Sequence, residues 1–201
     1  MSQTKAQLIN AVDGSIVDAD IVGLTSSKLS GALPAISGAS LTNLPSGGIT
    51  QSDQWRITST FITNSSDITS NWERVDTGGF GLIGSGMTQS SGIFTFPATG
   101  IYRIDLQVVA YRGTAQNIRF VNGYVKTTTD NSSYTEDSAA TSSISNDTNA
   151  YASLYLSHQF DVTNVSTHKV KFFVQAEDDL LWVGQTSLTQ TGATFTRLGD
   201  T

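Results

Sequence analysis

The feature that most constrains this chain is the position of its aromatic residues. All 18 Phe, Tyr and Trp residues lie at or after Trp55. Aromatic side chains supply much of the apolar area that a globular core buries, so the segment before Trp55 has little means of building a core of its own. It still carries regularly spaced leucines, which we expect to be buried against other copies of the chain. The asymmetry predicts an oligomeric stem followed by a globular head.

The N-terminal segment has a weak repeat. Ser-Gly-Ala units begin at Ser30 and Ser37, and Gly31, Pro34 and Gly38 interrupt a helix-like spacing of apolar residues at a cost of about 1–3 kcal/mol each. We expect short extended pieces stacked around a shared axis, with a disordered linker as the alternative. Pro45–Gly48 marks the boundary between a stem, residues 1–48, and a head, residues 49–201. The stem residues predicted to meet their symmetry mates are Leu24, Leu29, Leu33, Leu41 and Leu44.

Composition excludes several classes of function. The chain has no cysteine, hence no disulfide, thiolate nucleophile or Cys-based metal site. No basic and apolar leader follows Met1, and no apolar stretch of about 18 residues occurs, so we expect synthesis in a cytoplasm and no membrane insertion. The net charge of −6 argues against nucleic acid as a partner, because phosphate binding needs clustered Lys and Arg.

From Gln54 onward the hydrophobic pattern has a period of two residues, which is typical of strands with one buried face. On Tyr151–Val162, Leu154, Leu156 and Phe160 share one face, so Tyr151 and Tyr155 should point away from the core. Short strands separated by Gly, Asn, Asp and Ser clusters predict an all-β sandwich of the jelly-roll type. The expected strands are Trp55–Ile62, Trp72–Thr77, Ile93–Phe96, Gly100–Tyr111, Ile118–Lys126, Tyr151–Val162, His168–Ala176, Leu180–Val183 and Thr194–Leu198.

One segment, Thr127–Ala150, breaks this rhythm. It contains twelve Ser or Thr residues and four acids but no Lys or Arg. Ordering so polar a segment costs about 1–2 kcal/mol per residue with little apolar burial in return. We therefore expect a long loop, either functional or disordered. We also expect a Gly-Ser linker in its place to leave folding intact.

Three motifs have a functional and a structural interpretation. Gly79–Gly84 matches G-x-G-x-x-G, but a dinucleotide site needs a helix after it and a strand follows, so we interpret it as a loop. Glu177–Asp179 lies between two expected strands, where a solvated acidic turn is favoured over a cation site. His158 lies on the apolar face of its strand, which favours a core or interface role. We predict no metal site, no cofactor and no catalytic residue, and hence no enzyme.

The run Ser91–Ile104 resembles the signature of the complement-component globular-head and tumour-necrosis-factor-like superfamily, in which Gly-x-Phe-x-x-Pro-x-x-Gly-x-Tyr forms two adjacent central strands. The segment Ala193–Asp200 is similar to the closing strand of these domains. The resemblance covers roughly the whole head and implies a homotrimer of jelly rolls, with aromatic side chains of an inner sheet around the three-fold axis. The matching residues are Gly92, Phe94, Pro97, Gly100 and Tyr102.

The stem segment Lys28–Leu44 resembles repeats in tail-fibre and other virion proteins of marine bacteriophages. Together the two resemblances imply a trimeric fibre-type virion protein, made in the host cytoplasm and joined to other virion proteins through its N-terminal segment. We expect the head to bind a host surface glycan or protein. A purely structural virion component, such as a capsid-decorating fibre or baseplate protein, is the alternative, and a surface-polysaccharide depolymerase is a distant one.

Two sets of head residues are assigned to these functions. The long polar segment offers hydroxyls, amides and one aromatic ring, and its predicted receptor-binding residues are Asp130, Asn131, Tyr134, Glu136 and Asp137. Tyr151 and Tyr155 are predicted at the trimer interface, because tyrosine is enriched at subunit contacts.

Overall fold

The computed structural model describes residues 48–114 and 117–201, which contain eleven strands and no helix, and so none that could cross a membrane. This confirms the all-β prediction. The stem and its leucines lie outside the described residues, so their role stays a prediction. The strands are β1 Ser52–Ile57, β2 Ser59–Asp67, β3 Trp72–Arg74, β4 Thr88–Ser90, β5 Ile93–Thr95, β6 Gly100–Arg112, β7 Phe120–Thr128, β8 Thr135–Ser143, β9 Ala150–Val162, β10 Lys169–Gln185 and β11 Gly192–Gly199.

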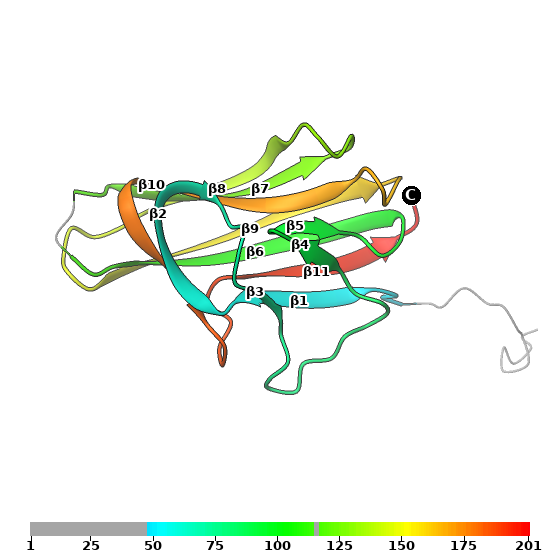
Figure 1. The fold of residues 1–201 in the computed structure, drawn as a ribbon, viewed down its shortest axis with the longest axis horizontal. Coiled ribbons are helices and arrows are strands. Elements are labelled where there is room, and N and C mark those ends of the chain that lie inside the picture. The colour runs from blue at the N-terminus through cyan, green and yellow to red at the C-terminus, as the bar shows by residue number, and fades with distance from the viewer. Residues whose placement is uncertain (1–47, 115–116) are drawn as a thin grey trace, which may run out of the picture. The chain divides into compact units, whose positions relative to one another are not determined.

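The strands form one sheet that curls into two layers (Figure 1). Antiparallel pairing in the first layer follows the order β3–β1–β11–β6–β9. In the second layer, β10 pairs with β7, β5 and β2, while β8 pairs with β7 and β4 with β5. Leu181 and Trp182 of β10 also pair with β6, which joins the layers. The arrangement is the predicted jelly-roll sandwich.

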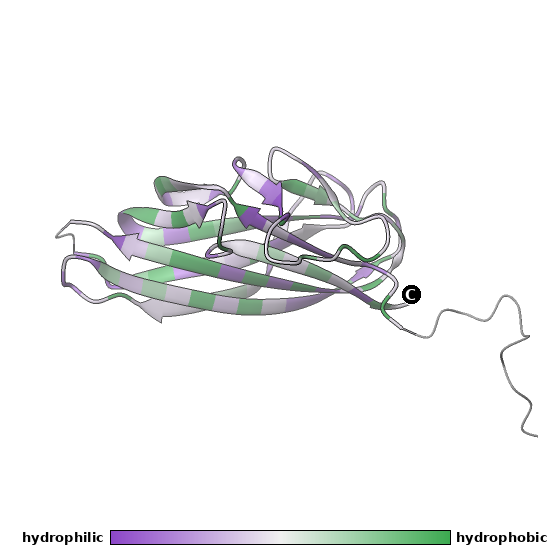
Figure 2. Cartoon of the chain, turned by 90° about the horizontal axis from the view of Figure 1, so that it is seen from below, coloured by the Kyte–Doolittle hydropathy of each residue, from purple (hydrophilic) through white to green (hydrophobic). Residues whose placement is uncertain are grey.

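Alternation of polar and apolar residues positions each strand on the core. Figure 2 shows this as bands of opposite hydropathy along the strands. On β9, Leu154 and Leu156 are buried, whereas Tyr151 and Tyr155 are 62% and 60% exposed. The predicted orientation of β9 is therefore confirmed.

The centre of the core is a cluster of aromatic rings around Phe94, which is fully buried. Trp55 and Trp72 meet it edge to face, with ring centroids 5.4 and 5.0 Å away. Phe172 and Phe195 complete the cluster at 5.6 and 5.0 Å. Because these five residues come from both layers, their packing fixes one layer on the other.

The signature residues have identifiable structural roles. Gly92 has φ of 75°, and a Cβ there would clash with the carbonyl oxygen of Ile68. The buried Tyr102 donates a hydrogen bond from its hydroxyl to the carbonyl oxygen of Ala98, at 3.1 Å, and so closes the turn before β6. The expectation of two adjacent strands is wrong, because β5 and β6 both pair with β10 and not with each other.

Two further expectations about strands are wrong. His168–Ala176 and Leu180–Val183 belong to one strand, β10, and Glu177–Asp179 lies within it. A shift in register against β2 between Gln175 and Leu180 accommodates the acidic residues without a turn. Conversely, Trp55–Ile62 is divided between β1 and β2.

The polar segment Thr127–Ala150 is also not a long loop. It contains β8, which pairs with β7 along its length, and Ile144 after it is buried in the core. Ala140 of β8 packs against the same core. Backbone pairing and these two side chains order the segment despite its polarity, so replacing all of it with a flexible linker should not be neutral.

The two ends of the head differ in what they carry. The described chain begins at Gly48 beside the end of β11, since the Arg197 amide donates to the Gln51 carbonyl. The turn between β7 and β8 lies at this same end, whereas the loop between β8 and β9 lies at the opposite end (Figure 1).

Candidate functional site

The exposed surface of β1, β11, β6 and β9 is the candidate functional site, and we call it the tyrosine face. It is formed by the side chains that point away from the core. Cross-strand pairing places Gln54 beside Thr194, Thr194 beside Asp105, and Gln107 beside Tyr155. The residues of its central part are Gln54, Arg103, Asp105, Gln107, Tyr155 and Thr194.

Tyr155 lies about halfway along β9, the last strand of this surface. Arg103 donates a hydrogen bond to Asp105, with Nε and Oδ1 3.0 Å apart, and a longer one of 3.4 Å to the Tyr155 hydroxyl. The carboxylate and the hydroxyl raise the pKa of the Arg103 guanidinium. The face therefore offers a tyrosine ring fixed by charged neighbours.

A shallow hollow of about 250 Å³ adjoins Tyr155. Gly192 lines it, and the Gln107 amide, which also lines it, donates to the carbonyl oxygen of Gln190 at 3.1 Å. A polar hollow beside an exposed aromatic ring suits the insertion of a partner's side chain. Its lining residues are Gln54, Asp105, Gln107, Tyr155, Thr189, Gly192 and Thr194.

Tyr151 lies on the same side of β9 but at its N-terminal end. It is directly opposite Tyr111 of β6, and the two ring centroids are 4.6 Å apart. Tyr151 and Tyr155 therefore occupy different parts of β9, one near its N-terminal end and one about halfway along it.

Of the predicted receptor-binding residues, Asp130 and Asn131 form the turn between β7 and β8. The Asp130 carboxylate accepts hydrogen bonds from the amides of Ser133 and Ser132, both at 2.8 Å, and from the Thr128 hydroxyl at 2.7 Å. These bonds, the Ser133 amide first, hold the pKa of Asp130 well below its usual range. Asn131 adopts a left-handed φ of 59°.

Tyr134 follows this turn and is partly buried. The Lys171 ammonium lies 4.2 Å from the centre of its ring, so one face of the ring is already in contact with a cation. Burial, followed by the nearby charges of Asp67 and Asp130, raises the pKa of its hydroxyl. The ring is thus less free for sugar stacking than its sequence position indicates.

Glu136 and Asp137 begin β8 and contact β7. Glu136 lies 3.7 Å from the Lys126 ammonium. Asp137 accepts hydrogen bonds from the hydroxyls of Thr127 and Thr135, at 2.5 and 2.8 Å. The structure thus brings the five predicted residues together, with several of their polar groups already in internal contacts. Receptor binding there stays a prediction.

One acidic residue of β10, Glu177, makes a salt bridge with Arg119. Glu177 accepts hydrogen bonds from the backbone amide and the guanidinium of Arg119, and these bonds lower the pKa of Glu177. Within residues 48–114 and 117–201, no group of three His, Asp or Glu side chains is arranged to hold a metal ion.

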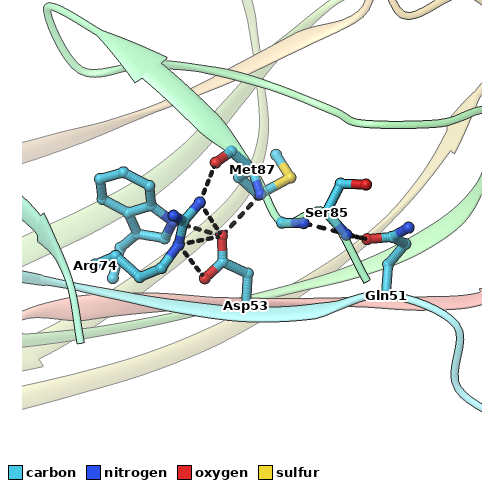
Figure 3. Close-up of polar contacts among 7 residues, drawn as sticks. Gln51, Asp53, Arg74, Ser85 and Met87 are labelled. Carbon is cyan, nitrogen blue, oxygen red and sulfur yellow. Dashed lines mark hydrogen bonds and ion pairs between the residues drawn. The ribbon is translucent and has the colours of Figure 1, made fainter. Parts of the chain in front are cut away.

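The glycine-rich motif is a loop, as predicted, and leads to β4 without a helix. A network that the sequence did not predict fixes the end of this loop (Figure 3). The buried Asp53 accepts hydrogen bonds from the Trp55 indole at 2.8 Å and the Met87 amide at 2.7 Å, and from the Arg74 guanidinium at 2.9–3.2 Å. Gln51 accepts from the Ser85 amide at 2.9 Å. This network is structural, because the Asp53 carboxylate is used within the domain.

No protein-family model and no curated protein matches this sequence. Solved structures do match the described fold. Murine APRIL at pH 5.0 is 17% identical with a TM-score of 0.53, covering 74% of this chain and 98% of that one. Eiger TNF from S. frugiperda is 11% identical with a TM-score of 0.57, covering 75% and 94%.

The pairing order, the core and these likenesses define the class of the head, an all-β jelly-roll sandwich. More particularly, it has the fold of the tumour-necrosis-factor-like domains. Identities this low show the fold and leave ligand and assembly open.

Proposed function

We propose that this chain is the subunit of a homotrimeric, fibre-type virion protein whose head binds a receptor on the host surface. The observation that carries the trimer is the tyrosine face. A tyrosine that is 60% exposed halfway along the outward side of β9 is unusual for a monomer and typical of a subunit contact. The resemblance to trimeric jelly rolls supports the same assembly.

The virion assignment is supported by the N-terminal sequence. Its spaced leucines lack aromatic neighbours, and Lys28–Leu44 resembles repeats of bacteriophage fibre proteins. The N-terminal segment would join other virion proteins and leave the head for recognition. The head acts by binding and not by catalysis.

The assembly is tested by light scattering on the full-length protein, which should give about three times the subunit mass of 21.4 kDa. Tyr155→Asp brings three carboxylates together near the axis in a poorly solvated contact, at a cost of several kcal/mol per trimer. The variant should dissociate while its circular dichroism still indicates strands. The matched control is Thr141→Asp, which places a charge at an exposed position of β8, outside the tyrosine face, and should leave the trimer intact. A wild-type monomer at micromolar concentration would contradict the trimer.

The receptor role is tested by adsorption. Purified protein should block attachment of a phage that carries it to its host cells. A trimer that never blocks attachment indicates a structural virion component instead. Release of reducing sugar from host polysaccharide would contradict the binding role and indicate a depolymerase.

A further inference from the structure

The end of the head opposite Gly48 is formed by the end of β6, the start of β9 and the loop between β8 and β9 (Figure 1). β6 contains 13 residues. An antiparallel strand rises about 3.4 Å per residue, so about 40 Å separates the two ends of this strand. A head held through its N-terminal segment, as proposed above, presents this opposite end outward.

The loop at this end, Ser145–Asn149, is joined to the end of β6 by hydrogen bonds. The fully buried Arg112 donates from Nη1 to the Ser145 carbonyl oxygen at 2.6 Å and to Asn146 Oδ1 at 3.0 Å. The Asn149 amide donates to the Arg112 carbonyl oxygen at 2.8 Å, and Asn149 adopts a left-handed φ of 66°. A loop fixed from below in this way loses little conformational entropy when its exposed side chains bind a ligand.

An aromatic pair lies beside this loop. Tyr151 is 62% exposed, and its ring packs against the ring of Tyr111 at an interplanar angle of 35°. The Tyr111 hydroxyl donates to Asn149 Oδ1, which connects the pair to the loop. All five residues of the loop are exposed. A supported ring and a row of amide and hydroxyl groups therefore meet on one surface.

We propose that Tyr151 and the Ser145–Asn149 loop form a binding subsite for a neutral sugar. A pyranose ring carries C–H groups on its faces and hydroxyls around its edge. The tyrosine ring complements a face, and the Asn146 amide and Thr148 hydroxyl complement the edge. Asp147 and the net charge of −6 disfavour an anionic sugar. The outward orientation rests on the proposed function, whereas the chemistry of the subsite does not.

The position of Tyr151 separates this role from the subunit contact predicted for it. Tyr151 is one residue from the N-terminal end of β9, next to the loop, whereas Tyr155 lies opposite Gln107 and adjoins the hollow. Tyr155 therefore suits a contact on the middle of the strand beside the hollow, and Tyr151 a contact at the end of the strand beside the loop.

The test measures binding of methyl β-D-galactopyranoside and a β-1,3-glucose hexamer to the full-length protein by ligand-observed NMR and calorimetry. N-acetylneuraminic acid serves as the anionic control. At least one neutral probe should bind and the anionic sugar should not. Tyr151→Ala should weaken binding about tenfold, the loss expected for one aromatic contact. Tyr151→Phe keeps the ring and should bind like the wild type. Both variants should keep the wild-type mass and melting temperature.

Three outcomes would overturn the subsite: no binding of either neutral probe at millimolar concentration, equal binding by Tyr151→Ala and the wild type, or a lowered oligomeric mass for Tyr151→Ala. The last outcome would indicate that Tyr151 lies at the subunit interface. Adsorption blocking separates this proposal from the previous one. Sugar binding without blocking of adsorption would support the subsite and refute the receptor role. Blocking of adsorption without sugar binding would support the receptor role and refute the subsite.

Discussion

Replacing Asp53 with asparagine tests whether the network around this carboxylate fixes the loop that precedes β4. Asp53 is 2% exposed, and the substitution keeps its shape. An amide oxygen in the Oδ2 position can still accept from the Met87 amide and the Trp55 indole, but the NH₂ group in the Oδ1 position then faces the Nε donor of Arg74. The variant thus removes the ion pair with Arg74 and places the N–H groups of asparagine against the N–H groups of the guanidinium.

The size of the effect follows from burial. Removing one partner of a buried ion pair costs about 3–5 kcal/mol. The Arg74 side chain is 35% exposed and can recover part of its hydration, so we expect the lower limit. For a domain of this size, about 3 kcal/mol corresponds to a fall in melting temperature of about 6–12 °C. The control is Asp200→Asn, which removes a salt bridge whose carboxylate is 92% exposed and should cost less than about 1 kcal/mol.

The assay is thermal unfolding at one fixed protein concentration, followed by far-ultraviolet circular dichroism and by the fluorescence of Trp55, Trp72 and Trp182. Fixed concentration matters because the melting temperature of an oligomer depends on it. If Asp53→Asn melts within about 2 °C of Asp200→Asn, the network contributes no more than a surface pair, and its structural role is refuted.

Two further predictions concern the signature and the turn. Gly92→Ala should lower the free energy of unfolding, measured in urea, by about 2 kcal/mol or more, because φ of 75° is strained for alanine and its Cβ would clash with the Ile68 carbonyl. The control is Gly79→Ala, which should cost less because Gly79 has a similar φ but lies in open space. Asp130 has a lowered pKa when folded, so the stability it contributes is present above its unfolded pKa of about 4 and is lost as pH falls through the folded value. Accordingly, the Ser132 and Ser133 amide resonances should hold their positions at pH 4 and move only at lower pH; movement centred near pH 4 would contradict the lowered pKa.

The sequence predicted the strands whose burial is one-sided. β6 and β9 alternate between more buried and more exposed residues along their length, so period two marked both and also gave the direction of Tyr155. β8 was missed because its buried contacts come from Ala140 and from backbone pairing, which leave no apolar alternation to detect. The continuity of β10 was missed because three consecutive acidic residues are typical of a turn between two strands.

The candidate site was predictable only where a pattern on one strand sufficed. The tyrosines of β9 could be found in this way. The Asp53 network and the loop fixed by Arg112 could not, because each joins residues 20 or more positions apart through hydrogen bonds, a relation that no local spacing reveals. Asp130 of the turn and Asp137 of β8 were identified by composition, which does not tell a free carboxylate from one already held by hydrogen bonds.

The polar segment between β7 and β9 provides the last prediction, since structure and sequence differ most there. One variant replaces only the turn, residues 129–134, with Asn-Gly, which suits a tight hairpin. The other replaces residues 129–149 with a Gly-Ser linker long enough to span about 30 Å from Thr128 to Ala150. The turn variant should fold and melt near the wild type. The full replacement should unfold or lose much of its stability, because the loss of buried Ile144 alone costs about 2–5 kcal/mol and the backbone of β7 loses its partner. Equal melting temperatures for the two variants would mean that β8 contributes nothing to the fold. If the turn variant also blocks host adsorption as well as the wild type does, recognition does not depend on Asp130, Asn131 or Tyr134, and the opposite end of the head becomes the favoured site.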